Sequence, residues 1–338
     1  MSDPEPRVAV VGAGAWGTTL ARLLARREPV TLVTHSAATA ERIRTTRRNE
    51  PRLPGIDLPG TLRATDDPSA VTTAGDLVVF AVPSSHLRSE VARVGASIPA
   101  SANLLSVTKG LEAGTLLRMS EVIADAGGFD PQRIAVLSGP NLALEIAHGG
   151  PASAVVAADD QALAQRVVQR LGSKRFRLYV NQDVLGVELC GALKNVLAIA
   201  AGACDGLGLG TNARAALLTR GISEMARLAV ALGGDARTVM GLSGVGDLIL
   251  TATGALSRNR ALGEKIAAGV EPAAFLASQR TVAEGYLTSK AAFALARKHG
   301  VEVPITEQVY HVLHEGRPLL EAMKQLVTRS QKDELWGF

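Results

Sequence analysis

The sequence of 338 residues predicts an α/β N-terminal domain with a doubly wound, mainly parallel sheet, followed by an all-α C-terminal domain. The first half alternates short, unbroken runs of Val, Leu and Ile with helical stretches, which is typical of a parallel sheet covered on both faces. After about residue 183 such runs become rare, and Ala, Leu, Glu and Arg recur at helical spacing. We therefore expect two domains, over residues 1–183 and 184–338.

Six strands are expected in the first domain, because each apolar run is short and a helical stretch separates it from the next. They are Arg7–Val11, Val30–Thr34, Leu77–Val82, Leu104–Val107, Ile134–Leu137 and Ala154–Ala157. Six helices are expected in the second domain. They are Asp183–Gly202, Asn212–Leu232, Arg258–Ala268, Thr288–His299, Thr306–His314 and Leu319–Leu326.

The composition indicates a soluble, cytoplasmic protein. It is 47% hydrophobic and 20% charged, which excludes a disordered chain and a disulfide-stapled module. Cys190 and Cys204 lie in apolar runs and cannot form a CxxC site, so no metal is expected. The net charge of +4 is dispersed and aromatic residues are few, which argues against a nucleic-acid partner. We expect no secretory signal in the acidic, proline-broken start, and no apolar run near the about 18 residues of a membrane span.

The clearest local motif is a G-x-G-x-x-G sequence that directly follows the first predicted strand. Gly12 permits a tight turn, Gly14 lets the backbone approach a pyrophosphate, and Gly17 lets the following helix pack closely on the strand. The helix N-terminus adds N–H donors and the positive end of a dipole. At the first strand of an alternating α/β half, this motif predicts a dinucleotide-binding Rossmann domain. A glycine turn without a ligand is the alternative.

The choice between NAD and NADP depends on the end of the second strand. An NAD site presents an acid there, but Thr31–Ser36 contains neither Asp nor Glu. Arginines that could pair with a 2′-phosphate follow nearby, although each is equally compatible with a solvated basic loop. They are Arg42, Arg44, Arg47 and Arg48. The sequence is thus compatible with either cofactor.

Two lysines and an asparagine are candidates for substrate chemistry. Lys109 and Asn141 each follow an apolar strand, at the sheet edge where open α/β sheets bind ligands. Lys194 interrupts an otherwise apolar helix, and a desolvated lysine has a lowered pKa that suits general acid–base catalysis. An ordinary loop lysine is the alternative for Lys109, and a solvated helix stripe is the alternative for Lys194.

Two segments of the second half add charged and capping groups. Asp247 lies in a glycine-rich turn, where it either holds Lys194 by charge or caps the next helix. Ser257 is a helix cap that puts Arg258 and Asn259 on the first turn, an arrangement suited to a phosphate. A plain capped surface helix is the alternative.

Together these segments resemble the bacterial NAD(P)-dependent glycerol-3-phosphate dehydrogenase family, in family order across nearly the whole chain. The matching segments are GAGAWGTTLA at 12–21, TKG at 108–110, SGPNLALEI at 138–146, GVELCGALKNVLAIAAG at 186–202, DGLGLGTNARAALLTRG at 205–221, GLSGVGDLILT at 241–251 and SRNR at 257–260. The resemblance implies reversible hydride transfer between NAD(P)H and dihydroxyacetone phosphate, giving sn-glycerol 3-phosphate for phospholipid synthesis. It also makes a homodimer an expected assembly.

The resemblance also assigns roles to individual residues, with Lys194 as the general acid and base at the C2 oxygen. Residues implied to face the substrate are Lys109, Gly139, Asn141, Lys194, Asp247, Ser257, Arg258 and Asn259. The cofactor is expected to contact the three motif glycines and the residues that the resemblance adds to them. The full set is Gly12, Gly14, Ala15, Trp16, Gly17, His35, Lys109, Ala143, Arg258, Val282 and Glu284. The chain departs from the family pattern at Asn141, where Ser or Thr is usual, and at Ala15, where Ser or Asn is frequent.

Two other functions fit the same general architecture. A β-hydroxyacid dehydrogenase also combines a Rossmann half, a helical half and a catalytic lysine, but the Ser257–Asn259 helix start favours a phosphorylated triose. A non-catalytic nucleotide sensor would have no need for Lys109, Lys194 and Asp247. Glycerol-3-phosphate dehydrogenase activity therefore explains the most residues.

Overall fold

The structure is a computed structural model that describes residues 7–278, 283–330 and 333–334. The chain forms two compact units. The sheet unit comprises Met1–Thr108 and Met119–Val184, and the helical unit comprises Lys109–Arg118 and Leu185–Phe338. The sequence assigned residues 109–118 to the first domain, whereas the structure groups them with the helical unit. The physical reason is that Leu111 is buried in the apolar core of the helical unit.

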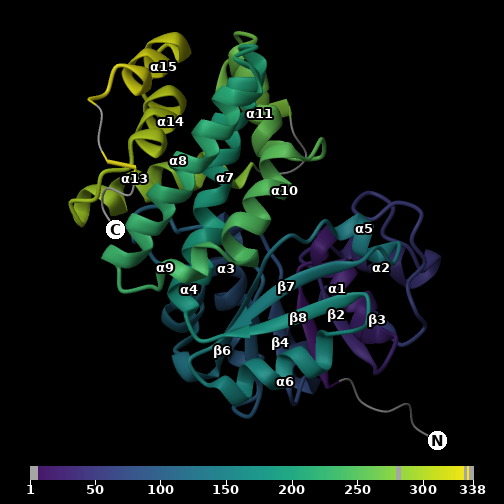
Figure 1. The fold of residues 1–338 in the computed structure, drawn as a ribbon. Helices are drawn as coiled ribbons and strands as arrows, with labels where there is room; N and C mark the ends of the chain where they lie inside the picture. The colour runs from purple at the N-terminus through teal and green to yellow at the C-terminus, as the bar shows by residue number, and fades with distance from the viewer. Residues whose placement is uncertain (1–6, 279–282, 331–332, 335–338) are drawn as a thin grey trace, which may run out of the picture. The chain divides into compact units, whose positions relative to one another are not determined.

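The sheet unit is built on eight described strands in the order β3-β2-β1-β4-β5-β6-β7-β8 (Figure 1). Their bounds are β1 Val8–Val11, β2 Val30–Val33, β3 Leu62–Thr65, β4 Leu77–Phe80, β5 Asn103–Ser106, β6 Ile134–Ser138, β7 Ala152–Ala157 and β8 Phe176–Asn181. Neighbouring strands are parallel except β6 and β7. From β1 the chain adds β2 and β3 on one side, and it then returns to add β4 on the other side of β1. In a Rossmann fold the ligand crevice lies at the carboxyl ends of the two strands at this switch point. The predicted fold class is confirmed.

Two of these strands were not predicted, and both lie at a sheet edge. β3 has the sequence LRAT and β8 the sequence FRLYVN, and each exposes some of its side chains. An edge strand needs no unbroken apolar run, because one of its sides lacks a strand partner. The signal used for the inner strands is therefore missing from β3 and β8.

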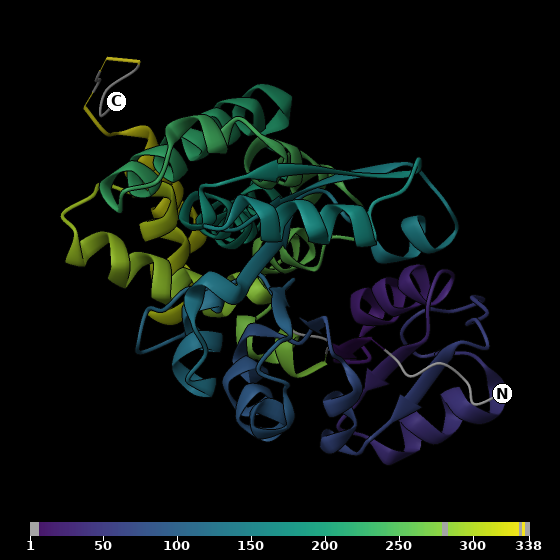
Figure 2. The same ribbon diagram turned by 90° about the horizontal axis from the view of Figure 1, so that it is seen from below.

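Helices cover both faces of the sheet (Figures 1 and 2). They are α1 Ala15–Ala25, α2 Ala37–Thr46, α3 Ser84–Val94, α4 Met119–Gly127, α5 Ala143–Ala147 and α6 Gln161–Leu171. α1 packs with α5 and α6, and Leu20, Ile146 and Leu163 from these helices share one apolar core. α3 packs with α4, and the buried side chains of this pair lie outside that core.

The helical unit consists of α-helices that surround α7 Val184–Gly206. The others are α8 Gly210–Ala231, α9 Ala236–Val239, α10 Asp247–Thr253, α11 Arg258–Ala267, α12 Pro272–Ser278, α13 Glu284–Lys298, α14 Pro304–His314 and α15 Leu319–Val327. The six predicted helices are present. α9, α10 and α12 were missed because helices of four to seven residues are too short to show a clear apolar period.

α7 corrects the expectation that no apolar run approaches a membrane span. Within the described ranges this helix of 23 residues is long and apolar enough to cross a membrane, with a mean hydropathy of 1.7. The pair Ala236–Thr253 and Arg258–Ala267, bent by 50°, passes the same test together. However, 89% of the apolar window of α7 is buried inside the protein, as expected for the core helix of a globular unit. α11 crosses α7 at Gly202 and Gly263, where a Cβ atom would collide with the other helix's backbone.

Candidate active site

The glycine loop after β1 has the geometry that pyrophosphate binding requires. Gly12 has a φ of +111°, and a Cβ there would collide with the Ala81 carbonyl after β4. Gly17 packs against Gly12 in the same way. At Gly14, by contrast, a Cβ would meet no described atom within 4 Å, so the space before α1 is open. No described side chain caps the N-terminus of α1, which leaves its first N–H groups to an anion. These residues fit a dinucleotide.

Asn49 holds this loop in place and was missed by the sequence analysis. Its buried amide nitrogen donates hydrogen bonds to the Ala13 carbonyl at 2.9 Å and to the Thr18 hydroxyl at 2.8 Å. No local pattern identifies Asn49, because it follows the loop by more than thirty residues. Ala15 and Trp16 begin α1, and the indole of Trp16 packs edge-on against Phe176 at 6.0 Å.

In a Rossmann fold the residues after the second strand contact the ribose of the cofactor, and in this chain these residues follow β2. His35 is exposed and lies two residues beyond β2, with no acidic residue between. Three of the four nearby arginines already have partners. The contacts are Arg44 with Glu41 at 2.5 Å, Arg47 with the carbonyls of Pro59 at 2.6 Å and Leu62 at 3.1 Å, and Arg48 with Asp57 at 2.6 Å. Within the described chain no partner is found for the guanidinium of Arg42, which is half-buried on α2.

A second group of predicted residues follows β6 in the sheet unit. Gly139 has a φ of +131°, and both polar atoms of the Asn141 amide are buried without a hydrogen-bond partner among the described residues. An unpartnered buried amide is costly, so the Asn141 side chain suits a polar ligand. Ala143 begins α5, and its carbonyl accepts a hydrogen bond from Thr19 of α1 at 3.2 Å. This contact brings the loop after β6 beside the glycine-loop helix.

In the helical unit, one carboxylate holds both predicted lysines. Asp247 accepts a hydrogen bond from the Lys194 ammonium on Oδ1 at 3.1 Å and one from the Lys109 ammonium on Oδ2 at 2.5 Å. The Asp247 side chain is 1% exposed, that of Lys194 9% and that of Lys109 19%. Lys194 therefore does not lie on a solvated stripe of its helix, and Asp247 holds it by charge.

Thr251 completes the surroundings of Lys194 and was also missed by the sequence analysis. Its hydroxyl accepts from the Lys194 ammonium at 2.6 Å and donates to the Asp247 carbonyl at 2.7 Å. Asp247 is the first residue of α10, and Thr251 lies one turn later on the same face. The spacing of four residues between Asp247 and Thr251 is the signal that could have identified Thr251.

Burial lowers the pKa of Lys194 to about 8. The Asp247 carboxylate opposes this shift, and the positive charges of Lys109 and Arg258 add to it. An amine with a pKa near 8 exchanges protons at physiological pH, as a general acid or base must. Lys194 is thus suited to give a proton to a substrate oxygen or to take one from it.

The start of α11 lies next to this lysine group. Ser257 caps the helix by accepting from the Arg260 N–H at 3.2 Å, as predicted, and Arg258 is the first helical residue. Asn259 is buried and links three helices: its amide donates to the Asn195 side chain at 2.8 Å and accepts from the Gly285 N–H at 3.0 Å. Asn195, the neighbour of Lys194 on α7, was not singled out from the sequence.

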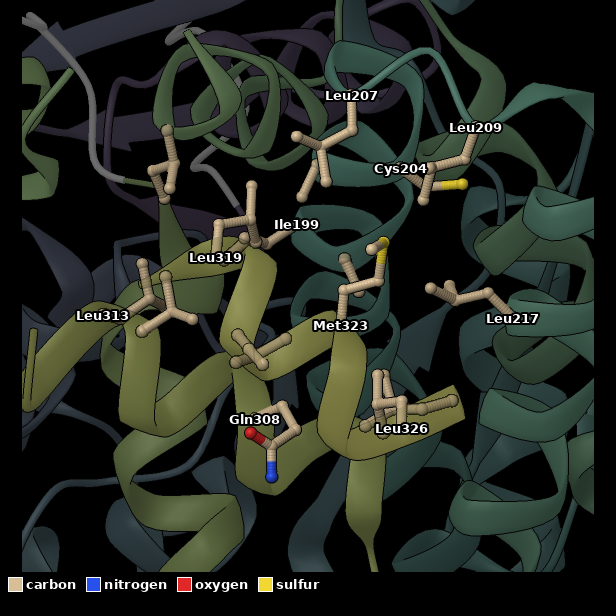
Figure 3. Close-up of a pocket in the computed structure, with 17 residues that line it drawn as sticks. Ile199, Cys204, Leu207, Leu209, Leu217, Gln308, Leu313, Leu319, Met323 and Leu326 are labelled. Carbon is tan, nitrogen blue, oxygen red and sulfur yellow. The ribbon is translucent and has the colours of Figure 1, made fainter. Parts of the chain in front are cut away.

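The remaining predicted residues are placed as follows. Glu284 is the first residue of α13, and Val282 lies outside the described residues. Among residues 7–278, 283–330 and 333–334, no group of three His, Cys, Asp or Glu side chains is arranged to hold a metal ion. An apolar pocket of the helical unit, between α7, α8, α14 and α15, is lined by Ile199, Leu217 and Met323 among others and includes no predicted site residue (Figure 3).

The fold and these two groups of residues define a class of protein. A Rossmann sheet with an open glycine loop is typical of proteins that bind a dinucleotide, and a buried lysine of lowered pKa is suited to general acid–base catalysis. Together they indicate an NAD(P)-dependent oxidoreductase. Models of NAD-dependent glycerol-3-phosphate dehydrogenase match the chain at residues 7–164 for the N-terminal domain and 183–324 for the C-terminal domain.

Known proteins narrow this class. A glycerol-3-phosphate dehydrogenase of the NAD(P)+ type from Geobacter sulfurreducens is 46% identical over 332 residues, 98% of this chain and 99% of the relative. One from Streptomyces avermitilis is 44% identical over 99% of both chains. The crystal structure of glycerol-3-phosphate dehydrogenase from Coxiella burnetii superposes with a TM-score of 0.90 at 39% identity, covering 96% of this chain and 99% of that one. The chain therefore belongs to the NAD-dependent glycerol-3-phosphate dehydrogenase family, which confirms the predicted family.

Asp247→Asn is expected to lower the free energy of unfolding by about 3 kcal/mol at pH 7, because two largely buried ammonium groups lose their counter-charge. The loss should shrink as the pH rises from 7 towards 10, since a neutral Lys194 needs no carboxylate. Urea unfolding at several pH values measures both effects. Asp235→Asn, at the exposed cap of α9, is the matched control and should change stability by less than about 0.5 kcal/mol. An equal, small loss in both variants contradicts the prediction.

Proposed function

We propose that the protein catalyses reversible hydride transfer between NAD(P)H and dihydroxyacetone phosphate, giving sn-glycerol 3-phosphate, with Lys194 as proton donor and acceptor. The observation that carries the proposal is the Lys194 ammonium, buried on the Asp247 carboxylate with its pKa lowered to about 8. Family membership supports the choice of substrate.

When bound, the reduced nicotinamide supplies the hydride that forms the new C–H bond at C2. As the C=O double bond of the substrate opens, Lys194 gives one proton to the oxygen and becomes a neutral amine. An ammonium has three N–H donors, and Asp247 and Thr251 accept two of those of Lys194. The third is left for the substrate oxygen, so Asp247 and Thr251 orient the proton transfer. In the oxidising direction the neutral amine takes the proton from the hydroxyl.

The phosphate of the substrate requires fixed positive charge. Arg258 supplies a guanidinium at the N-terminus of α11, a helix of ten residues, and Lys109 supplies a second cation beside Lys194. We assign Asp247, Ser257 and Asn259 of the helical unit to the walls of this substrate site. Gly139 and Asn141 of the sheet unit are assigned to the substrate by resemblance, and the unpartnered amide of Asn141 is suited to a polar ligand. Neutral side chains in place of Arg258 and Lys109 could not balance the charge of the phosphate dianion.

The cofactor is assigned mainly to the sheet unit. The open space at Gly14 and the uncapped N-terminus of α1 support pyrophosphate binding there by Gly12, Gly17, Ala15 and Trp16. His35 is assigned to the ribose side. Ala143, Glu284 and Val282 are assigned to the cofactor by resemblance alone, as are Lys109 and Arg258 on their cofactor side.

The biological setting is proposed from family resemblance. It supports a cytoplasmic enzyme that supplies sn-glycerol 3-phosphate to phospholipid synthesis. A homodimer is supported by the large apolar side chains that the helical unit exposes, which include Met240, Ile249 and Leu256.

Loss of absorbance of NADH or NADPH with dihydroxyacetone phosphate tests the reaction. Lys194→Ala should lower kcat by about 10²- to 10⁴-fold and leave cofactor affinity unchanged, because it removes a proton donor. For the wild type, kcat/KM for reduction should fall as the pH rises through about 8, where Lys194 loses its proton, and kcat/KM for oxidation should rise.

Lys298→Ala, an exposed lysine at the end of α13, is the matched control and should keep full activity. Protein that binds a dinucleotide and yet oxidises neither NADH nor NADPH would rule out this substrate. Full activity of Lys194→Ala would rule out the assigned proton donor.

Arg42→Ala should raise KM for NADPH by about tenfold and leave KM for NADH unchanged, because Arg42 is the one of these four arginines whose guanidinium has neither a hydrogen bond nor an ion pair with a described residue. Arg44→Ala, which removes a guanidinium already paired with Glu41, should change neither value by more than about twofold. Steady-state kinetics with each cofactor distinguishes the two. Equal rises for NADPH and NADH in Arg42→Ala would mean that Arg42 does not recognise the 2′-phosphate.

A further inference from the structure

The segment Lys109–Arg118, here called the lysine loop, is held to the helical unit by an ion pair at each end. At its start, Lys109 binds Asp247 of α10. At its end, the Arg118 guanidinium binds the Glu188 carboxylate of α7 at 2.8 Å, with side chains 18% and 5% exposed.

Backbone contacts join the two ends of the lysine loop. Leu111 and Arg118 form an antiparallel bridge, and the Glu112 N–H donates to the Leu117 carbonyl at 2.9 Å. Leu111 is 1% exposed and lies two residues from Lys109. Whatever fixes Arg118 therefore also fixes the main chain next to Lys109.

α7 connects this second anchor to the catalytic lysine. Glu188 and Lys194 are six residues apart on one continuous helix, which separates them by about 9 Å along its axis. The contacts thus close a ring: Lys194 to Asp247, Asp247 to Lys109, Lys109 through Leu111 to Arg118, and Arg118 through Glu188 back to α7.

We infer that the Arg118–Glu188 ion pair is a positioning device that holds Lys109 against Asp247 and so sets the affinity for the phosphorylated substrate. A buried ion pair is a poor source of stability, since an apolar pair of similar size often stabilises a protein as well or better. Lys109 also needs such an anchor, because the like charge of Lys194 on the same carboxylate repels it. The inference rests on the proposed function, in which Lys109 binds substrate.

A double-mutant cycle tests this role. Glu188→Gln keeps the shape of the side chain, and it should raise KM for dihydroxyacetone phosphate about tenfold while kcat changes less than twofold. In the Lys109→Ala background Glu188→Gln should not raise KM further, because Lys109, the residue that the ion pair positions, is gone. A tenfold rise in both backgrounds would overturn the inference, as would an unchanged KM in Glu188→Gln.

The pH profile of Glu188→Gln provides a readout that a purely structural role would not move. The charged groups around Lys194 are Asp247 on α10, Lys109 on the lysine loop and Arg258 on α11. If Lys109 moves away, one of the charges that lower the pKa of Lys194 is lost, so the pH at which reduction declines should rise. A profile identical to the wild type would count against the inference.

Two further variants control for folding. Glu224→Gln alters another buried glutamate of the helical unit, whose carboxylate accepts the N–H groups of Ile305 and Thr306 at the start of α14. It should leave KM unchanged even if the unfolding midpoint moves. If Glu188→Gln does not fold, Arg118→Gln removes the other charge of the same ion pair, and it should raise KM by a similar factor. A wild-type KM in Arg118→Gln would then overturn the inference.

The same measurements separate this inference from the proposed function. Wild-type protein that does not turn over dihydroxyacetone phosphate would contradict the proposed function. An active wild type and an inactive Lys194→Ala, combined with independent effects of Glu188→Gln and Lys109→Ala, would contradict the positioning role alone.

Discussion

The structure of the helical unit depends on one carboxylate that binds two ammonium groups. Two buried positive charges repel each other strongly in a medium of low dielectric constant, so Lys109 and Lys194 can share a site only with Asp247 between them. Asp247 in turn requires the glycine-rich turn before α10, where a Cβ at Gly244 would collide with the Val239 carbonyl. The apolar surroundings of α7 then keep the pKa of Lys194 near physiological pH.

The candidate binding groups of the two units differ in chemistry: main-chain groups in the sheet unit and charged side chains in the helical unit. The sheet unit uses the main chain: glycines without side chains, the uncapped start of α1 and a loop held by Asn49. The helical unit uses charged side chains that neutralise one another and are held by rigid helices. Affinity for a dinucleotide and chemistry on a phosphorylated substrate can therefore be changed by substitutions in separate parts of the chain.

Local patterns in the sequence predicted the parts of the site that depend on a single segment. The glycine loop directly follows an apolar strand, and Lys194 is a charge inside an apolar helix, so both are visible within about twenty residues. Asn49 and Asn195 could not be found in this way, because their roles depend on partners 31 to 64 positions away. The grouping of residues 109–118 with the helical unit could not be read from the sequence for the same reason, since the contacts of Lys109 and Arg118 are with α10 and α7.

The most direct test of this account is an NMR titration of the Lys194 ammonium in enzyme labelled at its lysine side chains, with the signal assigned by its absence in Lys194→Arg. Lys194 is expected to titrate at about pH 8, and at a lower pH in Asp247→Asn, where the carboxylate that favours the charged form is gone. A titration near the ordinary lysine value of 10.5, unchanged in Asp247→Asn, would contradict the claim that burial on a shared carboxylate prepares Lys194 for proton transfer.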